Sequence, residues 1–194
     1  MPSVTVQVAA DTDDCSSRED GVGRAVTSES KPFMGYNGAQ IWINAYRFPL
    51  NIPQGATITA ASLSVKAAAS DSGAAGFKMS CENVDNCGAF AYTTHDSLTM
   101  YANRVAYNPW WNVAEDWTVD NWYQSNTAWK CIQAVIDRAG WVAGNYIGMI
   151  VFGRTDYTNH RQFYHYADGG ANAMKLSVSW SVRNAIMRPG LGVW

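Results

Sequence analysis

The chain has 194 residues, of which 15% are charged and 13% aromatic, and its formal net charge at pH 7 is −2. This length suits about one domain. The scarcity of charged residues argues against a helical bundle or coiled coil, and the abundance of aromatic residues argues against disorder. The chain lacks the basic excess of a nucleic-acid-binding protein and any apolar run of about 18 residues that could span a membrane. We therefore expect neither nucleic acid nor a membrane as a partner.

Alternation of apolar and polar residues predicts a series of short strands. The predicted strands cover residues 4–8, 40–48, 58–67, 77–81, 146–152, 161–166 and 175–182. The strand over 77–81 is expected to pair with 58–67 as a hairpin. Residues 11–23 are polar and are expected to form a loop, and the aromatic-rich segment 82–125 is expected to be irregular. In the turn before residue 58, Gly55 is expected at a positive φ.

One helix is predicted after this irregular segment. Trp129, Ile132 and Ile136 recur at helical spacing, Thr127 is a candidate N-cap, and Gly140 is a candidate C-terminal cap. Many short strands and one short α-helix predict an all-β fold, a β-sandwich of the jelly-roll class. The sandwich is expected over residues 1–182, with residues 183–194 as a C-terminal extension that acts as an interaction arm.

A turn motif connects this pattern to a known group of domains. Tyr46-Arg47-Phe48 is followed by Asn51-Ile52-Pro53-Gln54-Gly55-Ala56-Thr57-Ile58-Thr59-Ala60-Ala61-Ser62-Leu63. This run resembles the F-x-x-I-P-x-G-A-T-I-x-x-A-x-L signature of DNRLRE-type, carbohydrate-binding-module-like jelly-roll domains. Segments 82–86, 110–122, 132–141 and 173–178 follow in the same order as in that group. The resemblance spans about residues 1–182 and implies a jelly-roll sandwich.

Such domains occur as appendages of secreted bacterial enzymes and as stand-alone proteins of tailed bacteriophages. The N-terminus, MPSVTVQVAADTDD, has neither the basic start nor the apolar stretch of a secretory signal, and residues 183–194 lie beyond the resemblance. The missing signal and the extra C-terminal residues both depart from the secreted examples of the group and favour its phage branch. A mature secreted fragment with an added Met is the alternative. We therefore expect a virion protein made in the host cytoplasm.

Within the virion, the favoured role is a capsid decoration or cement protein that binds the major capsid protein or another virion protein and forms homo-oligomers. The alternative is a carbohydrate-binding module or a receptor-binding lectin-like protein on the same scaffold. The C-terminal arm supplies the candidate interface residues, which are Arg183, Ile186, Met187, Arg188, Leu191, Val193 and Trp194. A second interpretation has the arm fold back over the edge of its own sandwich.

Catalytic motifs are missing from the sequence. No serine lies in a G-x-S-x-G elbow, and neither a P-loop nor a dinucleotide fingerprint is present. The acidic pairs at 13–14 and 115–116 are interpreted as solvated loops. Strand alternation puts His160 and His165 on opposite faces, where they cannot readily share a site. We therefore expect no catalytic residues and no enzymatic activity.

The aromatic residues allow three interpretations. Core packing is the favoured role for the tryptophans of segment 110–122, with a protein interface and sugar stacking as alternatives. Because side chains alternate along a strand, one member of the pair Trp110 and Trp111 must point outward. The candidates for stacking on a sugar are Trp110, Trp122 and Tyr123.

Four cysteines lie at 15, 81, 87 and 131. Cys81 and Cys87 flank a short polar stretch and are close enough in sequence for a disulfide across a loop. Free thiols, with Cys131 buried on the helix, are the alternative. The spacing does not match the C-x-x-C of zinc sites, so neither a metal nor another cofactor is expected.

Overall fold

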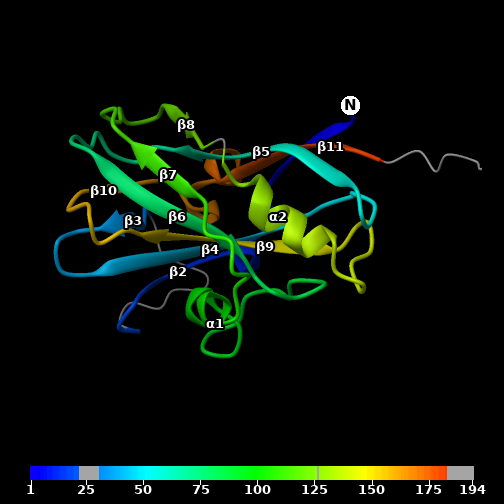
Figure 1. The fold of residues 1–194 in the computed structure, drawn as a ribbon. Helices are drawn as coiled ribbons and strands as arrows, with labels where there is room; N and C mark the ends of the chain where they lie inside the picture. The colour runs from blue at the N-terminus through cyan, green and yellow to red at the C-terminus, as the bar shows by residue number, and fades with distance from the viewer. Residues whose placement is uncertain (22–30, 126, 183–194) are drawn as a thin grey trace, which may run out of the picture.

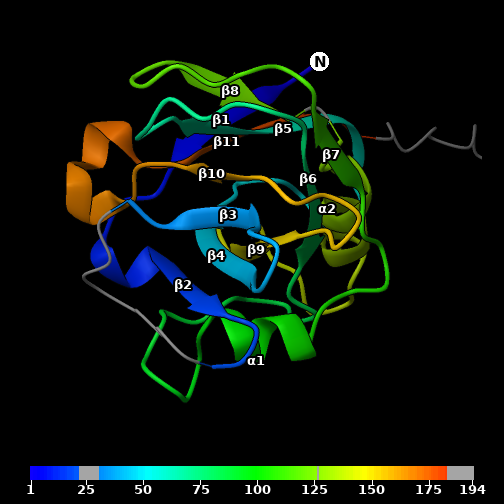
Figure 2. The ribbon, with the colours of Figure 1, turned by 90° about the vertical axis from the view of Figure 1, so that its left-hand side faces the viewer.

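A computed structural model describes residues 1–21, 31–125 and 127–182 of the chain. Within these residues two antiparallel sheets face each other across an apolar core (Figure 1). The fold is an all-β sandwich, as the sequence predicts. Figure 2 shows the strands of the smaller sheet at the top and most strands of the larger sheet below them.

The strand order places both ends of the described chain in the smaller sheet. This four-stranded sheet has the order β1 (Ser3–Gln7), β11 (Lys175–Ser181), β5 (Thr57–Lys66) and β8 (Trp122–Gln124). The seven-stranded sheet has the order β10 (His160–Gln162), β3 (Phe33–Tyr36), β4 (Ile41–Pro49), β9 (Tyr146–Gly153), β6 (Ala75–Cys81) and β7 (Trp110–Val113), with β2 (Asp14–Arg18) also paired to β4.

Alternating side chains fill the space between the sheets. On β5, Leu63 and Val65 are buried, and Leu176 and Val178 on β11 are buried beside them. The larger sheet contributes residues such as Phe77 to the same core. The period-2 pattern in the sequence therefore identified the inward faces of β5 and β11 correctly.

Helix α2 (Trp129–Ile136) packs against β5 and β6, with Ile132 and Ile136 fully buried. Both predicted caps are wrong. Thr127 donates its hydroxyl proton to the carbonyl of Trp110 (2.9 Å) instead of capping the helix, which begins after Ala128. The helix ends before Gly140, where a Cβ would collide with the carboxylate of Asp85.

A second helix, α1 (Ser97–Ala102), was not expected from the sequence. Asp96 caps it by accepting hydrogen bonds from the backbone N–H groups of Leu98 (3.1 Å) and Thr99 (3.0 Å). Together with the segment before it, α1 covers part of the outer face of the larger sheet and buries a second apolar cluster that includes Met100. No helix in the described ranges has the length and apolar character to cross a membrane.

Two expectations about pairing are wrong. Strand β6 does not form a hairpin with β5, because the chain crosses from one sheet to the other between them and β6 pairs with β7 and β9. The polar stretch after residue 11 is not all loop, because β2 pairs with β4 along its length. Three short 3-10 helices complete the described elements, at Asp11–Asp13, Tyr166–Asp168 and Gly170–Asn172.

Candidate functional site

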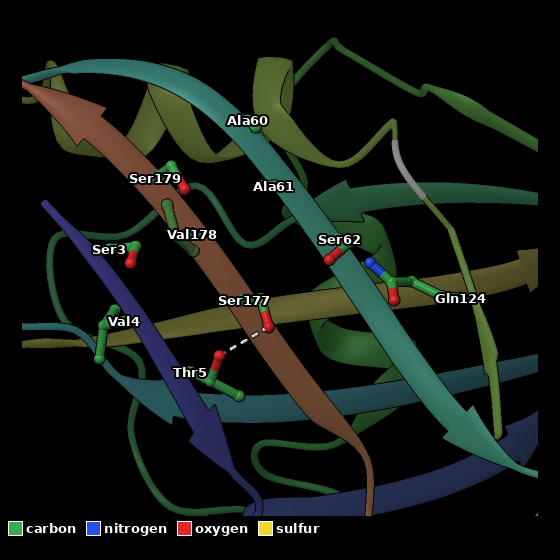
Figure 3. Close-up of a pocket in the computed structure, with 10 residues that line it drawn as sticks. All are labelled: Ser3, Val4, Thr5, Ala60, Ala61, Ser62, Gln124, Ser177, Val178 and Ser179. Atoms are coloured by element: carbon green, nitrogen blue, oxygen red, sulfur yellow. Dashed lines mark hydrogen bonds between the residues drawn. The ribbon is translucent and has the colours of Figure 1, made fainter. Parts of the chain in front are cut away.

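The outer face of the four-stranded sheet carries a shallow groove of about 330 Å³ (Figure 3). It is lined by Ser3, Val4, Thr5, Ala60, Ala61, Ser62, Gln124, Ser177, Val178 and Ser179. Because β1, β11 and β5 place small polar or alanine side chains at their outward positions, the middle of this face is lower than its surroundings. We call this surface the serine groove.

Strand register arranges the hydroxyl groups of the serine groove in rows. Thr5 lies opposite Ser177, which lies opposite Ser62, so that three hydroxyl side chains follow one another across three strands. The hydroxyls of Thr5 and Ser177 are hydrogen-bonded at 2.8 Å. Ser3 and Ser179 form the next row. Neighbouring strands are about 4.8 Å apart, so the groove presents closely spaced groups that both donate and accept hydrogen bonds.

An aromatic residue stands at one end of the serine groove. Trp122 lies two residues before Gln124 on β8 and therefore shares its outward face. Trp122 is 39% exposed. The ammonium group of Lys175, two residues before Ser177 on β11, lies 4.0 Å from the centroid of the Trp122 ring. The groove thus ends in a partly exposed indole, with one cation over its ring.

The three stacking candidates from the sequence do not form one site. Trp110 points outward, as alternation with the buried Trp111 requires, but it belongs to the edge strand of the other sheet. The guanidinium of Arg154 lies 4.0 Å from the Trp110 ring centroid. Tyr123 is half-buried and stacks in parallel on Trp117, with centroids 4.5 Å apart. Of the three, Trp122 alone adjoins the serine groove.

Several other predicted residues are placed differently from expectation. All four cysteines are buried and free, so the disulfide between Cys81 and Cys87 is not formed. Cys81 belongs to the core between the sheets and Cys87 to the outer cluster under α1. The arm residues at 183–194 lie outside the described ranges, and the structure does not test them.

The acidic pair at 13–14 is not a solvated loop. Asp13 is buried and pairs with Arg47 at 2.9 Å. Asp14 is buried too, accepts a hydrogen bond from the backbone N–H of Tyr166 (2.8 Å) and lies 3.7 Å from the Nδ1 atom of His165. Burial raises the pKa of Asp14 to about 7 and lowers the pKa of His165 to about 3. This enclosed pair belongs to the interior and offers no surface for a ligand.

A buried arginine was also not expected from the sequence. Arg161 on β10 is fully buried, and its guanidinium donates to the carbonyl oxygens of Gly73 (2.6 Å), His160 (2.9 Å) and Glu115 (3.1 Å). These bonds tie the loops at one end of the sandwich together. A lone arginine between polar residues gives no sign of burial, so only the fold could reveal this role.

Comparisons with known proteins carry no argument about the function of this chain. No protein-family model matches the chain, and no curated protein matches it. Among solved structures, the chain is similar to the family 11 carbohydrate-binding module from Clostridium thermocellum, solved in complex with a β-1,3-1,4-mixed-linked tetrasaccharide. The identity is 11%, the alignment covers 92% of this chain and 85% of the module, and the TM-score is 0.25. The function proposed below therefore rests on the geometry of the serine groove.

Proposed function

We propose that this chain is a non-enzymatic carbohydrate-binding protein and that the serine groove is its binding site. The observation that carries the proposal is the juxtaposition of hydroxyl rows with an exposed tryptophan on one sheet face. Ligand sites of this kind combine an apolar platform with a few converging polar groups.

Each part of the groove has a chemical counterpart in a sugar. The serine and threonine hydroxyls donate and accept hydrogen bonds, as sugar hydroxyls do, and the Gln124 amide adds two donors and an acceptor. The part of the Trp122 ring that the Lys175 ammonium leaves exposed offers an apolar surface for the C–H face of a pyranose. Strand register fixes the backbone positions of these groups, so binding requires little reordering of the chain.

The test is a glycan array probed with the full chain, followed by calorimetric titration of the glycan that binds most strongly. Trp122→Ala is expected to weaken binding at least tenfold, because it removes the stacking platform. Trp110→Ala is the matched control, since it removes an exposed tryptophan from the other sheet and should leave the affinity unchanged. Loss of binding in the control, with binding retained in Trp122→Ala, would place the sugar on the wrong face for this proposal.

A second candidate function is the virion structural role, and one feature of the same face favours it. Small side chains at the outward positions of β1, β11 and β5 allow another protein to approach the sheet closely, and among the described residues β1 is an edge strand of this sheet. In this case the chain is a decoration or cement protein that contacts the major capsid protein and forms homo-oligomers.

This second candidate is tested on isolated phage particles that carry the chain. Deleting residues 184–194 is expected to leave melting cooperative and to abolish retention on the particles, because the arm is the proposed anchor. Full occupancy by the truncated chain would rule out the arm. A chain that binds no glycan and assembles on particles would favour the structural role over carbohydrate binding.

A further inference from the structure

A separate group of ligating side chains gathers where the segment after β6 folds back over the larger sheet. Glu82, Cys87 and His95 each offer one donor atom, and these atoms lie within 4.8 Å of one another. Strand β9 anchors two of the three. The backbone N–H of Glu82 donates to the carbonyl of Gly148, and that of Cys87 donates to the carbonyl of Tyr146, both at 2.9 Å.

The close approach of these groups depends on a glycine in the middle of β9. A Cβ at Gly148 would lie 2.8 Å from the Sγ atom of Cys87 and 3.2 Å from the Cβ atom of Glu82. Any larger residue would push the thiol and the carboxylate out of place. The backbone of β9 therefore forms the floor of a cradle for these two ligands.

The carboxylate of Glu82 is only partly satisfied. Its Oε1 atom lies 3.0 Å from the Nε2 atom of His95. Its Oε2 atom is buried and has no hydrogen-bond partner within the described residues. A buried carboxylate oxygen without such a partner is costly, and a cation at this position would remove that cost.

The imidazole of His95 is oriented as metal-binding histidines usually are. Its Nδ1 atom lies 3.3 Å from the carbonyl oxygen of Ala89, to which it can donate, and its Nε2 atom points toward Glu82. Ligating histidines commonly donate their second ring N–H to a backbone carbonyl, which fixes the tautomer and aims the other nitrogen at the ion. The His95 side chain is 23% exposed, so an ion can reach the cluster from solvent.

We propose that Glu82, Cys87 and His95 bind a divalent transition-metal ion of the zinc class, with water as the fourth ligand. Zinc takes carboxylate oxygen, thiolate sulfur and imidazole nitrogen at about 2.0–2.3 Å in tetrahedral sites, and the three donor atoms already lie within 4.8 Å of one another. As the ion enters, the thiol proton and any proton on Nε2 leave to solvent.

Charge balance supports the site. One carboxylate, one thiolate and a neutral imidazole carry two negative charges, which a divalent cation neutralises.

The proposal is tested by titrating the full chain with Co²⁺, whose absorption spectrum depends on its ligands and its coordination geometry. We expect one ion per chain, a thiolate-to-cobalt absorption band in the near ultraviolet and the visible bands of a tetrahedral site. Cys87→Ser should remove the thiolate band, and His95→Asn should weaken binding at least tenfold. Cys131→Ala and His160→Asn are the controls, because both residues lie outside the cluster, and they should keep the spectrum.

X-ray absorption of the zinc-loaded wild-type chain needs no variant. One sulfur and a remaining shell of nitrogen and oxygen are expected. A shell without sulfur, a shell with two sulfurs, or a cobalt spectrum that survives Cys87→Ser would overturn the proposal. The serine groove lies on the other sheet, so these results are independent of the glycan array.

Discussion

The buried pair of Asp14 and His165 makes an unusual prediction for stability against pH. Both side chains are 4% exposed and their nearest titrating atoms are 3.7 Å apart. In the folded chain the pair holds one proton from about pH 3 to about pH 7, given the pKa of about 7 for Asp14 and about 3 for His165. In the unfolded chain it also holds one proton, from about pH 4 to about pH 6.5. The pair therefore adds almost no pH dependence to the free energy of unfolding in this window.

Breaking the pair should expose two opposite dependences. Asp14→Asn leaves His165, whose folded pKa is lowered, so stability is fully present above about pH 6.5 and is lost as the pH falls toward 3. His165→Gln leaves Asp14, whose folded pKa is raised, so stability is fully present below about pH 4 and is lost as the pH rises toward 7. Each slope approaches about 1.4 kcal/mol per pH unit.

The assay is urea denaturation of the wild type and both variants at pH 4, 5, 6 and 7. Other carboxylates titrate in all three proteins, so the informative quantity is each variant's slope relative to the wild type. We predict a positive difference for Asp14→Asn and a negative one for His165→Gln. Two differences of the same sign, or no difference, would contradict burial as the cause of the two opposite pKa shifts.

Three further substitutions test the fold by thermal melts. Gly55 has a φ of +69°, and no atom lies within 4 Å of the place that a Cβ would take. Gly55→Val should therefore cost about 1–3 kcal/mol through backbone strain alone. An unchanged melting temperature would contradict this conformation of the turn. Ile136→Asp should abolish cooperative folding, because it buries a charge beneath α2. A soluble variant that folds cooperatively would show that this face of α2 is not the buried one. Arg161→Met should cost about 2–5 kcal/mol by leaving buried carbonyls unpaired, and wild-type stability would show that Arg161 does not tie the loops.

The sequence predicted strands well where one face is buried and the other is exposed to solvent. Leu176 and Val178 alternate with serines, and β11 lies where this pattern puts it. Pairing was harder, because β6 is buried on nearly every side chain and carries no sign of which sheet it joins. Helix α1 was missed because Asp96 and Thr99 form its cap without the usual glutamate or glutamine.

For the candidate sites, too, local features were predicted and contacts between distant segments were not. Alternation predicted that one of Trp110 and Trp111 points outward, because it is a local rule, and the structure shows that this residue is Trp110. The serine groove did not follow, since Thr5 and Ser177 become neighbours only through pairing of strands from opposite ends of the chain. The cluster around Cys87 was missed for a similar reason, because its partners Glu82 and His95 converge only when the segment folds over β9.

Carbohydrate binding at the serine groove is tested most directly by amide chemical-shift mapping. The isotopically labelled chain is titrated with the glycan that binds most strongly on the array. Shifts are expected at Thr5, Ser177 and Gln124, together with the indole N–H of Trp122, because these groups line one face of the four-stranded sheet. Shifts confined to the face that carries Trp110, or an array on which no glycan binds the chain, would contradict the proposed site.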